Sequence, residues 1–122
     1  MQQIRFFETL VSRHYKGKIY ILQDKHSFSA AEVWMIAGRY ADKLDMTTVG
    51  TFTGGMQRYG ECRSIKKESV FGWIPTIVCG LPDDGKWKGE GVGYEPDVFA
   101  YTEELKDVLT GFGVDMDGIE IQ

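Results

Sequence analysis

The sequence predicts an α/β protein, because a stretch typical of a buried strand is followed by a turn, a buried helix and another strand. Residues 18–23 are short, apolar and rich in β-forming side chains. Residues 30–43 carry apolar side chains at helical spacing, and residues 47–49 predict the next strand. The helix side chains expected to face the core are Val33, Ile36, Ala37, Tyr40 and Leu44, with Ala30, Trp34 and Met35 widening the buried surface. A strand, a crossover helix and a further strand make one α/β unit, whose crossover is right-handed in nearly all proteins.

The flanking segments give weaker signals. Residues 4–11 fit a helix or a strand equally well. The glycine-rich residues 50–60 predict a loop. Residues 62–66 and 70–78 predict paired strands, with Pro75 at an edge or a bulge because proline cannot donate to a sheet.

Two segments complete the expected secondary structure. Residues 81–93 are rich in turn-forming residues and predict a long loop. Residues 102–109 predict a helix with Thr102 as its N-cap. Glu103 and Glu104 would then lie in the first turn, where the helix dipole favours negative charge.

The composition indicates one small globular domain over residues 1–122. The formal net charge is −4 and no lysine or arginine stripe stands out, so nucleic acid is not an expected partner. No apolar run approaches the length of a membrane span. The two cysteines, Cys62 and Cys79, match no metal-binding pattern and do not indicate a disulfide bridge. Neither a metal nor a cofactor is expected.

Residues 26–32 read His-Ser-Phe-Ser-Ala-Ala-Glu and place a serine where the predicted strand turns into the predicted helix. Acyl-transfer enzymes place a nucleophile at such a junction, where free backbone N–H groups and the helix dipole stabilise negative charge. The same residues also fit a capping box, in which the Ser29 oxygen accepts the N–H of Glu32 and the Glu32 carboxylate reaches back. Both interpretations need Ser29 at the first turn of the helix, so spacing alone leaves them open.

Short segments along most of the chain follow one another in a recognisable order. They are Gly-Lys-Ile-Tyr-Ile-Leu (17–22), Ser-Phe-Ser-Ala-Ala-Glu (27–32), Val-Gly (49–50), Thr-Gly-Gly (53–55), Ile-Pro-Thr (74–76), Leu-Pro-Asp-Asp-Gly (81–85) and Glu-Gly-Val-Gly-Tyr-Glu-Pro-Asp (90–97). In this order they resemble the C-terminal half of the tail-specific (C-terminal-processing) serine peptidase family. Relatives of that family include the tricorn-core proteases and the retinoid-binding repeats of the retina.

The resemblance implies roles for three residues and a fold. Ser29 would be the nucleophile, and the backbone N–H of Ala30 would supply half of an oxyanion hole. Ser27 would shape the turn, and the other half of the hole would come from a glycine turn earlier in the family's domain. The implied fold is the crotonase-like or Clp-protease-like superfold of β-β-α units. Residues 1–122 would be the C-terminal portion of a larger peptidase catalytic domain.

The resemblance also distinguishes two branches of the family. The serine–lysine branch places its lysine base just after a Thr-Phe-Gly run, and here the matching residues 53–55 are followed by Met56, which cannot take a proton. Lys43 and Lys66 lie outside the motif and are expected to be solvated. The tricorn-like branch uses a histidine from the N-terminal half with a glutamate that Glu90 matches. From the residues alone, Glu90 also fits a solvated loop carboxylate.

The remaining candidates for proton transfer are few. Of the two histidines, His14 is expected to be exposed, and His26 lies three residues before Ser29. A base must be held at hydrogen-bond distance and oriented by a third group, which a tight-turn neighbour seldom provides. Asp97 follows Pro96 and is interpreted as a turn or cap residue, not an acid catalyst.

Three functions are therefore consistent with the sequence. The leading one is the catalytic-domain portion of a serine endopeptidase that acts on a peptide or protein, with its base supplied from outside this chain. The second is a catalytically inactive binding relative in which Ser29 is only a cap. The third is a scaffold fragment whose homo-oligomerisation covers exposed surface. The family resemblance suggests a place outside the cytoplasm, in the periplasm or at the cell surface.

Overall fold

The computed structural model describes residues 2–39, 41, 44–55, 59–67, 70–78 and 85–122. In chain order its elements are α1 (Gln2–Ser12), β1 (Lys18–Gln23), α2 (Ala30–Arg39), β2 (Asp45–Gly50), β3 (Tyr59–Lys67), β4 (Val70–Val78), β5 (Val98–Phe99), the 3₁₀ turn η1 (Thr102–Glu104) and α3 (Leu105–Gly111). The undecided segment at residues 4–11 is thus a helix.

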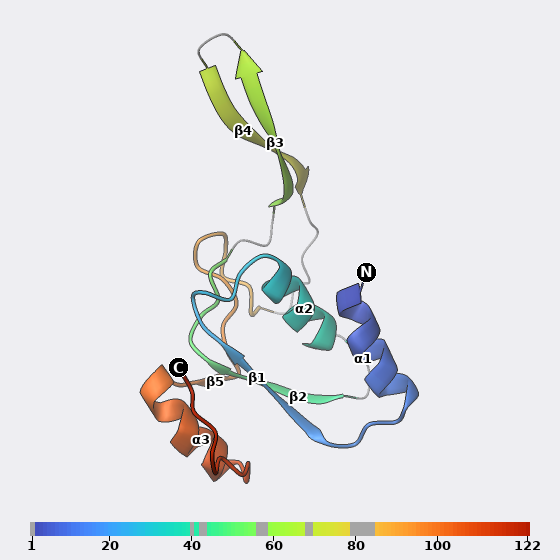
Figure 1. Cartoon of the computed structure of the whole chain (residues 1–122), viewed down its shortest axis with the longest axis vertical. Helices are drawn as coiled ribbons and strands as arrows, with labels where there is room; N and C mark the ends of the chain where they lie inside the picture. Colours follow the sequence, from blue (N-terminus) through green and yellow to red (C-terminus); the bar gives the residue numbers. More distant parts are fainter. Residues whose placement is uncertain (1, 40, 42–43, 56–58, 68–69, 79–84) are drawn as a thin grey trace.

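The sheet that organises the molecule is parallel and has the strand order β1-β2-β5 (Figure 1). β1 pairs with β2 along its whole length, from Lys18 opposite Asp45 to Gln23 opposite Gly50. The α/β class and the strands predicted at residues 18–23 and 47–49 are confirmed, and the second strand is longer than expected. Because the strands are parallel, their carboxyl ends meet at one edge, where α/β proteins commonly bind ligands.

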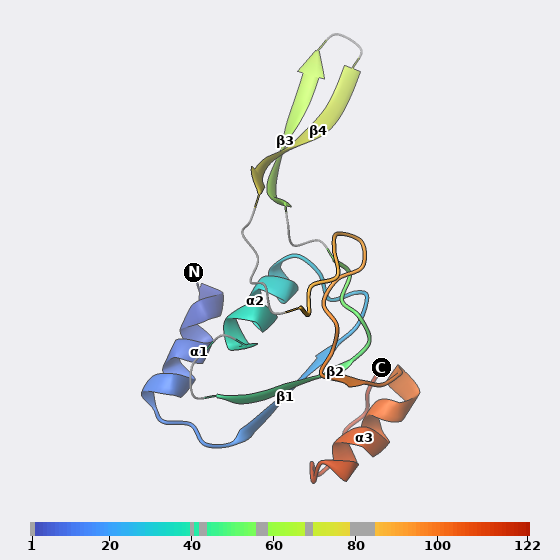
Figure 2. The ribbon, with the colours of Figure 1, turned by 180° about the vertical axis from the view of Figure 1, so that it is seen from behind.

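Helices cover both faces of this sheet, with α1 and α2 on one side and α3 on the other (Figure 2). Successive side chains of a strand point to opposite faces, so each face has its own core. The core under α2 contains Ile21, Met35 and Tyr94. The core under α3 contains Val49, Ala100 and Leu105.

The helix predicted over residues 30–43 is shorter in the structure. It begins at Ala30 as expected, although Ala30 itself is exposed, and it ends at Arg39. Leu44 lies beyond the helix and is half-buried. Tyr40 and Lys43 lie outside the described residues. The prediction extended the helix too far because the apolar spacing continues into the segment that leads to β2.

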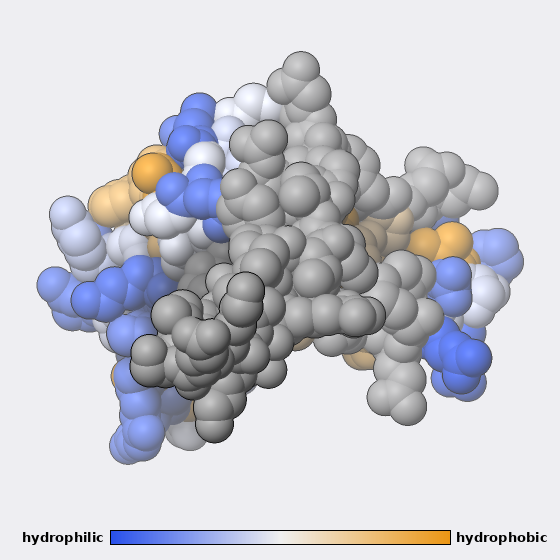
Figure 3. Space-filling view, turned by 90° about the horizontal axis from the view of Figure 1, so that it is seen from above, coloured by the Kyte–Doolittle hydropathy of each residue, from blue (hydrophilic) through white to orange (hydrophobic). Residues whose placement is uncertain are grey.

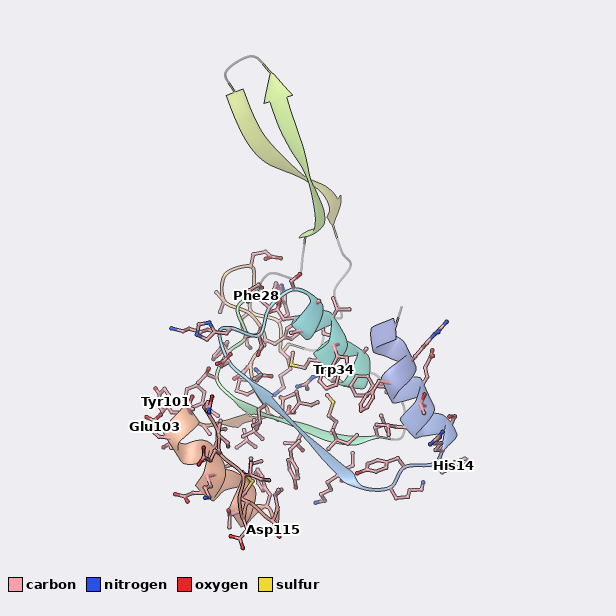
Figure 4. All side chains as sticks on the ribbon, in the orientation of Figure 1. His14, Phe28, Trp34, Tyr101, Glu103 and Asp115 are labelled. Atoms are coloured by element: carbon pink, nitrogen blue, oxygen red, sulfur yellow. The ribbon has the colours of Figure 1, made fainter. Side chains whose placement is uncertain are left out.

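The buried face of α2 was also predicted imperfectly. Val33, Ile36 and Ala37 are half-buried, and the most buried helix residues are Glu32, Met35 and Gly38. Gly38 is buried because α1 packs over it, and the ring of Phe7 occupies the space that a Cβ would need. Phe7 also packs on Trp34, which lies on the α1 side of α2 (Figure 4), with ring centroids 5.0 Å apart. Glu32 is buried through hydrogen bonds, which an apolar spacing cannot predict.

The paired strands predicted after the glycine loop are confirmed as the antiparallel hairpin β3–β4. Pro75 pairs with Cys62 next to a register shift in this two-stranded sheet, as expected for proline at a bulge and an edge. The hairpin extends away from the parallel sheet (Figure 1). Residues 85–93 form a loop as predicted, and residues 79–84, which include Cys79, lie outside the described residues.

The helix predicted over residues 102–109 begins differently from the prediction. It starts as the turn η1, its N-cap is Tyr101 and not Thr102, and the Glu104 carboxylate accepts the Tyr101 N–H at 2.8 Å. The Glu104 side chain is long enough to reach Tyr101, one residue before the threonine that the sequence suggested as the cap. At the other end, Gly113 has a φ of 86°, and its N–H and that of Val114 bond back to the last turn, which ends α3.

The face of the molecule on the hairpin side exposes mainly hydrophilic residues where it is described (Figure 3). Figure 3 looks down on the molecule from the hairpin side and shows hydrophilic residues on both flanks with small, separate hydrophobic patches. Among the described residues, no helix combines the length and the apolar character needed to cross a membrane.

Candidate active site at the start of α2

The predicted serine lies in a tight connection between β1 and α2, at the carboxyl edge of the sheet. The connection starts with a turn in which the Ser27 N–H bonds to the Asp24 carbonyl at 2.9 Å. The Asp24 carboxylate accepts the N–H of His26 at 2.8 Å, as aspartate does in an Asx turn. Ser27 therefore shapes the turn, as the sequence suggested. Phe28, labelled in Figure 4, marks the point where this turn enters α2.

Ser29 has a backbone conformation that is unusual for a serine. Its φ is 53°, in the left-handed region, and its carbonyl accepts the Val33 N–H at 3.0 Å as the first bond of α2. Left-handed backbone is unfavourable for residues other than glycine and is concentrated at functional sites. Ser29 and Ala30 are both exposed. Among the described residues, neither the Ser29 hydroxyl nor the Ala30 N–H has a hydrogen-bond partner.

Glu32 stabilises this turn from the interior of the protein. Its side chain is fully buried, and Oε2 accepts the Ser29 N–H at 2.9 Å. This is the glutamate half of the predicted capping box. The other carboxylate oxygen, Oε1, accepts the Thr53 hydroxyl at 2.6 Å and the Gly55 N–H at 2.8 Å. The sequence pattern identified the bond to Ser29 but not the bonds to residues 53–55, which come from a distant part of the chain.

Residues 53–55 form an irregular segment that contacts both the serine turn and the loop before β5. The Gly54 N–H bonds to the Ser27 carbonyl at 2.9 Å, and the Gly55 carbonyl accepts the Gly91 N–H at 2.8 Å. Gly55 has a φ of 75°, and a Cβ there would lie 2.6 Å from the Gly93 nitrogen. Only glycine fits this approach, because any side chain would collide with backbone.

Glu90 lies in the turn that packs against Gly55. The Gly93 N–H bonds to the Gly89 carbonyl at 2.9 Å and closes a turn around Glu90, which is exposed. The Gly91 N–H contacts Gly55, whose own N–H is bound by Glu32. The segments of Ser29 and Glu90 are thus joined through Glu32 and Gly55. The role of Glu90 stays a prediction.

Two cavities lie at this edge of the sheet. One of about 210 Å³ is lined by residues from the ends of β1 and β2 and by Ala100 and Leu105, and one of about 120 Å³ is lined by Ala31, Glu32 and Thr53 among others. Gln23 and Ser27 line both of them. Ser29 lines neither of these two cavities.

The other residues that the sequence analysis considered for proton transfer lie as follows. His14 lies at the turn after α1, far from the turn marked by Phe28 (Figure 4). Its φ of 54° places it at the left-handed residue that ends α1. His26 is exposed. Met56 lies outside the described residues, and so does the side chain of Lys66 in β3.

Asp97 joins the far end of α2 to β2. Its carboxylate accepts the Thr48 N–H at 2.9 Å and pairs with Arg39 at 3.2 Å and with Lys86 at 3.3 Å. Burial opposes ionisation of this carboxyl, but the Thr48 N–H and the charge and hydrogen bonds of Arg39 and Thr48 outweigh it and lower the pKa of Asp97 below 3.8. Asp97 thus links three segments and is not the local turn or cap residue that the sequence suggested.

The described residues contain no group of three or more His, Cys, Asp or Glu side chains placed to hold a metal ion. In the comparisons with known proteins, no protein-family model and no curated protein matches this chain.

Proposed function

We propose that this chain carries the nucleophile of a serine peptidase of the tail-specific type, closer to its tricorn-like branch, with Ser29 as the reactive residue. The observation that carries the proposal is the left-handed conformation of Ser29 at an exposed strand-to-helix turn. A nucleophilic serine is placed on such a strained turn, which exposes its Oγ and turns the next backbone N–H toward the same side.

In the proposed reaction, Ser29 Oγ attacks the carbonyl carbon of a peptide bond while a base takes the hydroxyl proton. The Ala30 N–H stabilises the oxyanion of the tetrahedral intermediate. The base then gives its proton to the leaving amine, and water releases the acyl group by the same steps. Glu90 orients the base, which comes from residues outside this chain. The 122 residues would then be the C-terminal portion of a crotonase-like catalytic domain.

One observation favours a second candidate, a binding relative without catalysis. Ser29 lines neither of the two cavities at the sheet edge, whereas Ser27 and Gln23 line both. In that case, the cavities would receive a ligand and Ser29 would serve only to start α2. The two candidates differ in whether the Ser29 hydroxyl is required for turnover.

The test is peptide hydrolysis by the protein expressed from its complete gene. Ser29→Ala should lower turnover by several orders of magnitude, because the covalent step is lost. Ser27→Ala is the matched control, since it removes a hydroxyl two residues away in the same turn. An active wild-type protein whose turnover falls with Ser27→Ala and not with Ser29→Ala would refute the assignment. A folded wild-type protein without hydrolysis would support the binding relative.

Two further variants test the rest of the mechanism. Glu90→Ala should lower turnover in a folded enzyme, and Met56→Ala should leave it largely intact because methionine has no titratable group. The 122-residue chain alone should not hydrolyse peptides, since in this proposal the base and half of the oxyanion hole come from outside it. Proteolysis by that chain, abolished by Ser29→Ala, would instead make His26 the candidate base.

A further inference from the structure

We infer that Glu32 is a positioning residue that couples the two proposed site residues. Its single buried carboxylate fixes the backbone of Ser29 and also binds residues 53–55, against which the Glu90 segment packs. The inference rests on the proposed function of Ser29. It assigns Glu32 no contact with substrate.

The Glu32 carboxylate divides its hydrogen bonds between two segments. Oε2 binds the Ser29 N–H at 2.9 Å, and Oε1 binds the Thr53 hydroxyl at 2.6 Å and the Gly55 N–H at 2.8 Å. A carboxylate that only began a helix would need the first of these bonds and could stay in solvent. Glu32 is instead fully buried, so its hydrogen bonds replace the water that it has lost.

The backbone of Ser29 needs contacts that hold its conformation. Its left-handed conformation is less favourable than the extended one that most N-cap residues adopt, so surrounding contacts must hold it. The bond from its N–H to Glu32 is such a contact. A change in the φ of Ser29 would rotate its Oγ and the Ala30 N–H together relative to the turn that precedes them. Glu32 therefore helps to hold the nucleophile and the oxyanion donor in one orientation relative to the preceding turn.

Glu32 is also connected to the loop that carries Glu90. The Thr53 hydroxyl oxygen accepts the Tyr94 N–H at 2.8 Å, and the Gly55 carbonyl accepts the Gly91 N–H at 2.8 Å. These contacts lie on the loop just after Glu90. Through Thr53 and Gly55, the same carboxylate fixes the position of this loop relative to Ser29.

The test variant is Glu32→Gln, which keeps the shape of the side chain. The Ser29 N–H, the Thr53 hydroxyl and the Gly55 N–H all donate to Glu32, so the amide NH₂ must face either Ser29 or the Thr53 and Gly55 pair and loses at least one of these backbone bonds. Thr53→Val is a milder variant that removes only the hydroxyl. Glu104→Gln is the matched control, because Glu104 also accepts the N–H three residues before it, at 2.8 Å to Tyr101, but lies exposed.

The first readout is the rate at which a fluorophosphonate labels Ser29, per folded molecule, in the protein from the complete gene. Glu32→Gln should lower this rate on the order of 100-fold, because small misplacements of reacting groups have effects of that size. Thr53→Val should lower it less, and Glu104→Gln should leave it within about threefold. A purely structural role would reduce the melting temperature and leave the rate per folded molecule unchanged.

The second readout is amide hydrogen exchange at Ser29 and Gly55 in the 122-residue chain. Both amides should be protected in the wild type, and Glu32→Gln should accelerate the exchange of at least one.

Labelling of wild-type Ser29 with no loss in Glu32→Gln or Thr53→Val would overturn the inference alone. No labelling of wild-type Ser29 would overturn the proposed function. Unchanged exchange at both amides in folded Glu32→Gln would also overturn the inference. If Glu32→Gln does not fold, Thr53→Val decides.

Discussion

The start of α2 and the start of η1 use the same local hydrogen bond in different surroundings. In each, a glutamate accepts the backbone N–H three residues before it, Glu32 from Ser29 at 2.9 Å and Glu104 from Tyr101 at 2.8 Å. Tyr101 has an extended backbone, with φ −75° and ψ 161°, whereas Ser29 has a φ of 53°. Glu104 is exposed, whereas Glu32 is fully buried.

The start of α2 has two features that a helix start does not require, the left-handed Ser29 and the buried Glu32. Tyr101 shows that this capping bond forms without a left-handed residue. The conformation of Ser29 and the burial of Glu32 are therefore not needed to begin a helix. Strained backbone that persists without a local need is typical of functional sites. The difference between the two helix starts is the structural basis for treating Ser29 as more than a cap.

The largest expected difference between the two helix starts is in stability. Glu32→Gln should lower the free energy of unfolding by about 1–3 kcal/mol, because the N–H of Ser29 or of Gly55 loses its bond to a fully buried side chain. Glu104→Gln should cost less than about 1 kcal/mol, because water can bind the released Tyr101 N–H. Urea unfolding of the 122-residue chain measures both values. Equal losses would mean that burial of Glu32 contributes nothing beyond a surface cap.

The far ends of the two helices should differ in their response to acid. α2 ends at Arg39, which pairs with Asp97, whereas α3 ends through Gly113 without a charge. Folding lowers the pKa of Asp97, so its ionised carboxylate stabilises the folded chain. This contribution to the free energy of unfolding is complete above pH 3.8 and is lost as the pH falls through the folded pKa. Asp97→Asn should therefore be less stable than the wild type at pH 7, with a gap that narrows toward acid. A gap in urea midpoints that is constant from pH 7 to pH 3 would contradict this.

The smallest expected effects concern His14 and Ser29, the two non-glycine residues in the described part of the chain that are left-handed. His14→Gly should stabilise the chain by about 1 kcal/mol, because glycine adopts this conformation without strain at the end of α1. Ser29→Gly should exceed Ser29→Ala in stability by a similar amount. Thermal unfolding checks both differences. His14→Gly should leave Ser29 labelling unchanged, and a loss of labelling would connect the end of α1 to the site.

Much of the fold could be predicted because it depends on local patterns. The strand at residues 18–23, the hairpin with its edge proline and the first residue of α2 all follow from side-chain alternation and turn residues. The buried face of α2 could not be predicted, because Gly38 is covered by Phe7 from another helix and by Met46 from β2. Apolar spacing contains no signal for such a contact.

The candidate site was predictable only where its residues are neighbours in sequence. Ser29 and Glu32 are three residues apart, so the capping pattern indicated their bond. The contacts of Glu32 with Thr53 and Gly55 connect positions more than twenty residues apart, and no local pattern encodes them. The φ of Ser29 was equally hidden, because the sequence of a capping box is compatible with either backbone conformation. The importance of Glu32 therefore emerges from the three-dimensional structure.

The most direct test of the central claim is to locate a covalent adduct. The protein from the complete gene is treated with a fluorophosphonate and digested, and the modified residue between His26 and Glu32 is located by fragment-ion mass spectrometry. We predict an adduct on Ser29 that is absent after Ser29→Ala and retained after Ser27→Ala. An adduct on Ser27, or an unmodified turn in a protein that hydrolyses peptides, would contradict the assignment of Ser29 as the nucleophile.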